Sequence, residues 1–111
     1  MIVLQTAMKT VSLYALAAAF YVFGGTLMKY SRGLTRLLPS LALVAVFSAG
    51  ALIQAKAMRH EPLGPSYVVV LGLEALLAVV AGYVIFAEQV TVKTLSGVLL
   101  VLLGILALRL P

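Results

Sequence analysis

The stretch SYVVVLGLEALLAVVAGYVIF, from Ser66 to Phe86, decides the fold of this chain. A helix that crosses a membrane needs about 20 consecutive and predominantly apolar residues. This stretch meets that requirement and contains a single charged side chain, Glu74. Its apolar run is continuous and lacks the alternation over about ten residues that is typical of a barrel strand. The stretch is therefore predicted to form a transmembrane helix.

Three further apolar runs accompany this stretch and extend the prediction to the whole chain. Of the 111 residues, 64% are hydrophobic and 10% are charged, whereas about a quarter of an average soluble domain is charged. The alternative, a soluble helical bundle, would leave large apolar patches in water. We therefore predict an all-α membrane protein that forms a single domain over residues 1–111. Its four transmembrane helices are expected at about residues 11–28, 39–58, 66–86 and 92–110.

Composition and motifs exclude several classes of protein. The chain has no cysteine, which excludes disulfides, thiol catalysis and thiolate metal sites. His60 is the only histidine, and we find neither a phosphate loop nor a nucleophile elbow, so we expect no enzyme, no metal and no cofactor. The net charge of +5 comes from scattered basic residues. Such residues are typical of anchoring at lipid headgroups rather than of nucleic-acid binding.

The basic residues divide evenly between the two sides of the membrane. Orientation normally follows an excess of Lys and Arg on the cytoplasmic side, and here neither side has one. Insertion in both orientations, with pairing of two inverted copies, is one interpretation. A real bias hidden by a residue at ambiguous depth is the other. The two sets are Lys9, Lys56, Arg59 and Arg109 on one side, and Lys29, Arg32, Arg36 and Lys93 on the other.

Glu74 is the charged residue that the sequence places clearly at membrane depth. An ionisable group there costs about 2.5–3.5 kcal/mol on the insertion scale and is a candidate functional residue by default. Helical geometry puts Tyr67 on the same face, because the two positions lie within an arc of about 60°. The group could bind a proton or a solute. It could instead be a protonated side chain that hydrogen-bonds a neighbouring helix.

The first span carries a second polar stripe, formed by Tyr14 and Tyr21. Phenols at this depth need hydrogen-bond partners, so both stripes are expected to face the interior of the bundle. Tyr21 opposite Glu74 is a natural pair, although an ordinary interhelical contact explains the stripes equally well. In the last span Gly97 and Gly104 share one face, which favours close helix packing.

The segment from Gly24 to Ser40, GGTLMKYSRGLTRLLPS, closely resembles the end of the first helix and the first loop of the small multidrug resistance family. In that family this stretch reads roughly G-T-x-L-M-K-x-S-x-G-F-T-R-x-x-P-S. Residues 62–67 and 86–89 match more weakly. The resemblance implies a four-helix protomer of the drug/metabolite transporter superfamily, usually an antiparallel dimer that exchanges protons for a small cation across the inner membrane of bacteria. It assigns Gly97 and Gly104 to the dimer contact and Tyr67 to the binding pocket.

Two positions depart from the family pattern. The family's proton- and substrate-binding carboxylate lies in the first helix, three residues before the glycine that corresponds to Gly24, and here that position is Tyr21. A phenol with a reference pKa near 10 cannot replace a carboxylate that cycles protons near neutrality. The aromatic residue expected three positions after Tyr67 is also absent, since this position is Val70.

Two hypotheses follow from these departures. In the first, the binding carboxylate has moved to Glu74, and the protein transports a small cationic or amphipathic solute with possible proton coupling. In the second, the protein carries a lipid-linked cargo as a flippase or serves as an accessory subunit of a larger membrane complex. Across the two hypotheses the expected partner is a second copy, a homologous subunit or that larger complex, together with membrane lipid. The second hypothesis rests on analogy at the level of the fold.

Overall fold

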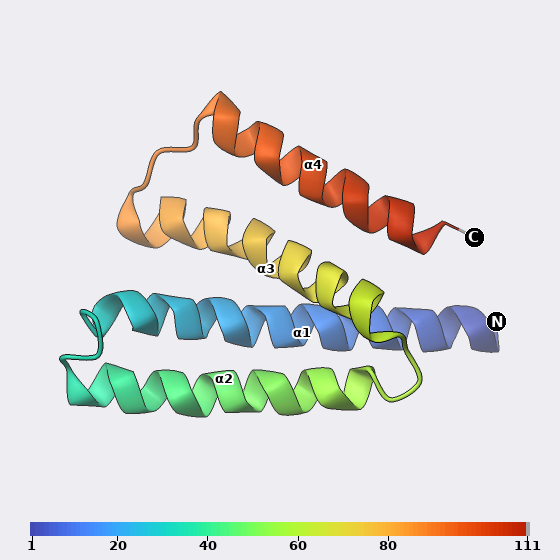
Figure 1. The fold of residues 1–111 in the computed structure, drawn as a ribbon, viewed down its shortest axis with the longest axis horizontal. Coiled ribbons are helices and arrows are strands. Elements are labelled where there is room, and N and C mark those ends of the chain that lie inside the picture. Colours follow the sequence, from blue (N-terminus) through green and yellow to red (C-terminus); the bar gives the residue numbers. More distant parts are fainter. Residues whose placement is uncertain (111) are drawn as a thin grey trace.

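The computed structural model describes residues 1–110 and consists of four helices joined by short connections (Figure 1). The helices are α1 (Ile2–Tyr30), α2 (Leu37–Ala57), α3 (Leu63–Phe86) and α4 (Val92–Arg109). All four are long and apolar enough to cross a membrane. The predicted all-α fold with four transmembrane helices is confirmed, and the chain is a multi-pass membrane protein.

The first helix begins at Ile2, ahead of the apolar run that starts at about residue 11. Residues 2–10 contain neither glycine nor proline, so nothing in this lead interrupts the helical backbone. The Thr6 hydroxyl donates to the carbonyl oxygen of Ile2 at 2.9 Å, a contact within one helical turn. The amino-terminal lead is therefore an extension of α1.

A tight connection between α1 and α2 is organised by Ser31, which is 1% exposed. Its hydroxyl donates to the Met28 carbonyl at 2.7 Å and accepts from the Leu34 amide at 3.2 Å. Within this turn Gly33 has a φ of 68°, a left-handed conformation that glycine adopts without steric cost. The serine hydroxyl thus links the end of α1 to the loop that reverses the chain.

The packing of the four helices is uneven. Helix α1 packs against both α2 and α3, whereas α4 packs against α3 alone; Figure 1 shows α4 on the outer side of α3, away from α1 and α2. At Gly72 the side chains of Val101 and Ile105 occupy the space that a Cβ atom would need. Glycine at this position therefore lets α3 and α4 approach closely.

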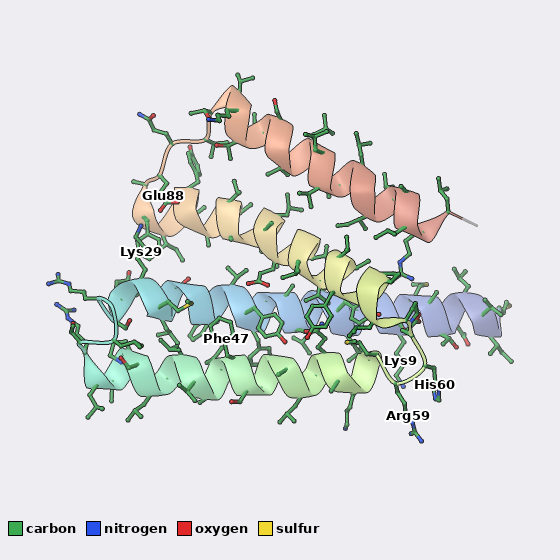
Figure 2. The ribbon with its side chains drawn as sticks, in the orientation of Figure 1. Lys9, Lys29, Phe47, Arg59, His60 and Glu88 are labelled. Atoms are coloured by element: carbon green, nitrogen blue, oxygen red, sulfur yellow. The ribbon has the colours of Figure 1, made fainter. Side chains whose placement is uncertain are left out.

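Charged side chains gather at the two ends of the bundle. Lys9 lies at the same end as Arg59 and His60, while Lys29 lies at the opposite end (Figure 2). Since α1 continues through Lys9, this lysine is part of a helix but still belongs to the side to which the sequence analysis assigned it. The apolar middle of the bundle and its basic ends match the two regions of a bilayer.

Candidate functional site

The register of α1 against α3 brings Tyr21 and Glu74 to the same level. The buried hydroxyl of Tyr14 donates to Ser66 Oγ at 2.7 Å, which fixes the two helices side by side near the start of α3. Both helices run in the same direction from this contact (Figure 1). Two helical turns, about seven residues, separate Tyr14 from Tyr21 and lead from Ser66 to the neighbourhood of Glu74. The phenol and the carboxyl line the same two pockets.

The first pocket, of about 200 Å³, runs between α1 and α3. Tyr21 and Glu74 line it at mid-helix, and Lys29, Phe86 and Glu88 line it toward the end of the bundle. Figure 2 shows Lys29 and Glu88 pointing toward one another at that end. The pocket therefore connects the carboxyl at membrane depth with a pair of charged residues at the membrane boundary.

The second pocket, of about 280 Å³, lies on the α2 side of the same carboxyl. Tyr21 and Glu74 are shared with the first pocket, and Phe47, Gln54 and Tyr67 complete much of the wall. Tyr67 is 48% exposed, so packing within the protomer leaves part of its side chain accessible. The predicted proximity of Tyr67 and Glu74 is seen here in a pocket that three helices form.

Glu74 itself has no hydrogen-bond or ion-pair partner among residues 1–110. Its side chain is partly covered, in the middle of a helix whose neighbouring residues are apolar. A carboxylate at membrane depth without a partner is costly. Its charge must be neutralised, and a proton or a cation that enters the pocket can do this.

Tyr21 is held in place by α2. Its hydroxyl donates to Gln54 Oε1 at 2.7 Å, and its ring lies 5.5 Å from that of Phe47, centroid to centroid. A Cβ atom at Gly50 would lie 2.9 Å from Cε1 of Tyr21, so the ring fits because this residue is glycine. The suggested pair of Tyr21 and Glu74 share a pocket, but the tyrosine hydroxyl is hydrogen-bonded to Gln54 and not to Glu74.

Glu88 is held beside Lys29 by a turn at the end of α3. Ala87 adopts a left-handed conformation with a φ of 55°, and the Glu88 amide donates to the Gly82 carbonyl at 3.0 Å. This turn brings the Glu88 carboxylate to 3.0 Å from Lys29 Nζ. The same ammonium lies 5.1 Å from the centre of the Phe86 ring, within reach of a cation–π interaction.

The remaining predicted residues lie away from the two pockets. Tyr14 is fully buried beneath the start of α3 and lines neither pocket that contains Glu74. Gly97 and Gly104 on α4 are exposed, and a Cβ atom built on either would meet nothing within 4 Å. Within this protomer the two glycines are therefore not used for helix packing.

Gln54, which was not predicted from the sequence, lies beside Tyr21 in the second pocket. Its position three residues before the end of α2 is typical of a polar side chain at the membrane boundary. It is instead 4% exposed. The sequence does contain a signal for this residue, because an uncharged amide within the apolar α2 needs a hydrogen-bond partner.

The fold and the site define a small multi-pass membrane transporter. Its central feature is one unpartnered carboxyl with phenols in an apolar pocket, an arrangement that can bind and release cations or protons. No group of three or more potential metal ligands occurs within residues 1–110.

Comparison with known proteins identifies the family. The sequence profile of the Small Multidrug Resistance protein family matches residues 2–101. Over 94 residues the chain is 30% identical to quaternary ammonium compound-resistance protein QacC of Staphylococcus aureus, covering 85% of this chain and 88% of the relative. It is 34% identical over 83 residues to a guanidinium exporter of Escherichia coli, covering 75% and 79%. The chain therefore belongs to the small multidrug resistance family, which consists of transporters and not of enzymes.

Proposed function

We propose that this protein transports a small organic cation across the inner membrane of a bacterium and that Glu74 is the carboxylate that binds it. The unpartnered Glu74 carboxyl in the pocket between α1 and α3 is the observation that carries the proposal. The relatives named for quaternary ammonium resistance and guanidinium export support the choice of cargo. Both cargoes named there are small organic cations, which a single carboxylate can neutralise.

Competition for one carboxylate provides the coupling. An ionised carboxyl in an apolar pocket is stabilised by either a proton or an organic cation, because each neutralises its charge. The two therefore exclude one another at Glu74. Release of the cation on one side of the membrane with uptake of a proton would couple the movement of the two species.

In this proposal α3 replaces α1 as the source of the binding carboxylate. The family resemblance puts the usual acid at the position of Tyr21, and no Asp or Glu occurs in residues 2–30. Tyr21 on α1 and Glu74 on α3 line the same pockets. A carboxylate on α3 can therefore contact a cargo in the same space as a carboxylate at position 21 would. Val70, which is 1% exposed, stands where the family has an aromatic residue, and the cargo is consequently expected to make less aromatic contact.

We further propose that the working unit is an antiparallel dimer, of two copies or of one copy with a homologous subunit. The exposed face of α4 that contains Gly97 and Gly104 offers a surface for close helix contact. The even division of basic residues between the two ends favours insertion in both orientations. The two features support the same assembly independently.

The proposal is tested by uptake of tetramethylammonium into proteoliposomes with an imposed proton gradient. Glu74→Gln is expected to abolish gradient-driven uptake, because the amide keeps the size of the side chain and removes its charge. Glu61→Gln, the same exchange in the connection between α2 and α3, is the matched control and is expected to transport normally. Unchanged uptake by Glu74→Gln in a correctly folded protein would overturn the proposal.

A second candidate function is movement of a lipid-linked cargo. A crevice of about 300 Å³ between α1 and α3 is lined by apolar side chains, among them Val22, Leu77 and Ile85. Such a surface suits an acyl or prenyl chain better than a hydrated ion. Purification in mild detergent followed by mass spectrometry of bound lipids and proteins distinguishes the candidates, since a stably bound lipid carrier or a larger complex favours this second function.

A further inference from the structure

We propose that Gln54 is a specificity-determining residue and that the cargo is a small organic cation with a hydrogen-bond-accepting oxygen near its charge. This inference rests on the proposed function, since it requires a cation at Glu74. The geometry behind it is the second pocket, in which the amide of Gln54 and the carboxyl of Glu74 line the same space of about 280 Å³. The two groups offer a cargo the N–H donors of one amide and one negative charge.

The hydrogen bonding of Gln54 is incomplete. A glutamine amide has two N–H donors and one carbonyl acceptor. The carbonyl oxygen, Oε1, accepts from the Tyr21 hydroxyl at 2.7 Å. The buried Nε2 atom has no acceptor among residues 1–110, although the side chain is only 4% exposed. Buried polar groups are nearly always paired, so an unpaired donor in a side chain that lines a pocket points to a ligand with an acceptor.

The orientation of the amide follows from its neighbour. With Oε1 toward Tyr21, the phenol proton and the carbonyl satisfy each other, and the unpaired groups are the two hydrogens on Nε2. Rotating the amide by half a turn would place Nε2 toward the phenol oxygen. The carbonyl, the phenol proton and one N–H would then be unpaired. The orientation that leaves the fewest groups unpaired is the one in which the N–H donors of Nε2 lack an acceptor.

The size of the pocket restricts the cargo. A space of about 280 Å³ is at the lower end of the range for small-molecule sites. A cation that contacts Glu74 and Gln54 together must therefore carry its oxygen only a few bonds from the charge. Ether, ester and hydroxyl derivatives of short-chain ammonium ions have this form. A bare alkylammonium ion fills the same space but leaves Nε2 unpaired.

Two probes that differ by one atom test the inference. (2-Methoxyethyl)trimethylammonium and n-butyltrimethylammonium have the same charge and nearly the same shape, and an ether oxygen in one replaces a methylene in the other. Their half-saturating concentrations are measured from uptake of the labelled probes, driven by an imposed proton gradient, into proteoliposomes of the wild type and of Gln54→Met, which keeps the side-chain length without the amide. The wild type is expected to prefer the methoxy compound by about tenfold, because pairing a buried donor is worth roughly that factor. Gln54→Met is expected to lose the preference.

Tyr21→Phe tests how the amide is oriented. This variant removes the phenol that donates to Oε1, so the amide can rotate and the preference for oxygen is expected to weaken. Equal affinities of the wild type for both probes would overturn the inference, as would a preference that survives in Gln54→Met. A preference that Tyr21→Phe leaves unchanged would contradict the orientation assigned to the amide. If both probes are transported in a manner that depends on Glu74 but with equal affinity, the further inference is overturned and the proposed function stands. Failure to transport either probe would count against the proposed function as well.

Discussion

Tyr21 on α1 and Gln54 on α2 are joined by a hydrogen bond of 2.7 Å at the wall of the pocket that contains Glu74. The bond crosses between two helices, and the ring that carries it rests against the backbone of Gly50. The position of the tyrosine therefore depends on α2 as much as on the helix to which it belongs. Any change that moves the ring also changes the pocket.

Gly50→Ala is expected to displace Tyr21. The added methyl would lie 2.9 Å from Cε1 of the ring, and overpacking of this kind typically costs about 1–3 kcal/mol. We expect lower thermal stability in detergent and reduced cation uptake. Gly64→Ala is the matched control, since a Cβ atom there meets nothing within 4 Å. Equal stability of the two variants would contradict this account of Gly50.

Tyr14→Phe tests the hydrogen bond that sets the register of α1 against α3. The substitution keeps the fully buried ring and removes the hydroxyl that donates to Ser66 Oγ. The expected loss is about 0.5–1.5 kcal/mol in the free energy of unfolding. Tyr14→Ala, which also leaves a cavity, should cost about 3–5 kcal/mol. Unfolding measured by circular dichroism in detergent should rank the two variants in that order.

The ion pair of Lys29 and Glu88 is expected to contribute little to stability. Its side chains are 58% and 51% exposed, and exposed pairs typically contribute about 0.2–1 kcal/mol. A double-mutant cycle with Lys29→Met and Glu88→Gln should give a coupling energy in this range, falling as salt is added. A coupling well above 1 kcal/mol at high salt would show that the pair is shielded from solvent in the membrane.

Gly97→Leu is expected to break the proposed dimer without unfolding the protomer. The glycine is exposed on α4 with open space around it, so a leucine fits in the monomer but would separate two helices in close contact. Site-specific cross-linking in membranes should show the loss of the dimer. Leu103→Ala, at another exposed position of α4, serves as the control. An intact dimer in Gly97→Leu would show that the interface lies on another surface.

The sequence predicted the helices well because each is a long apolar run between clusters of polar residues. Gln5 and Lys9 left it open whether the lead before residue 11 extends the first helix or lies at the interface, and in the structure this lead is helical. The rotation of each helix about its axis was harder to predict. Tyr21 could face α2 or α3, and only the packed structure shows that its hydroxyl reaches Gln54.

Sequence patterns did not predict the contacts between residues far apart in the chain. Lys29 and Glu88 are 59 positions apart, and their pairing depends on the left-handed turn at Ala87. Alanine seldom adopts that conformation, so no residue in the sequence marks the turn. Glu74, in contrast, could be identified from the sequence, because a charge within a long apolar run stands out whatever the packing.

The attachment of α4 to the bundle through α3 alone has a mechanical consequence. Within the protomer α4 is joined to the other helices by its packing against α3 and by the short link over residues 87–91, so we expect α1, α2 and α3 to be able to tilt together while α4 keeps its place. If a partner holds α4 fixed, the pocket around Glu74 moves together with α1, α2 and α3. We expect the packing between α3 and α4 to set which side of the membrane the pocket then faces.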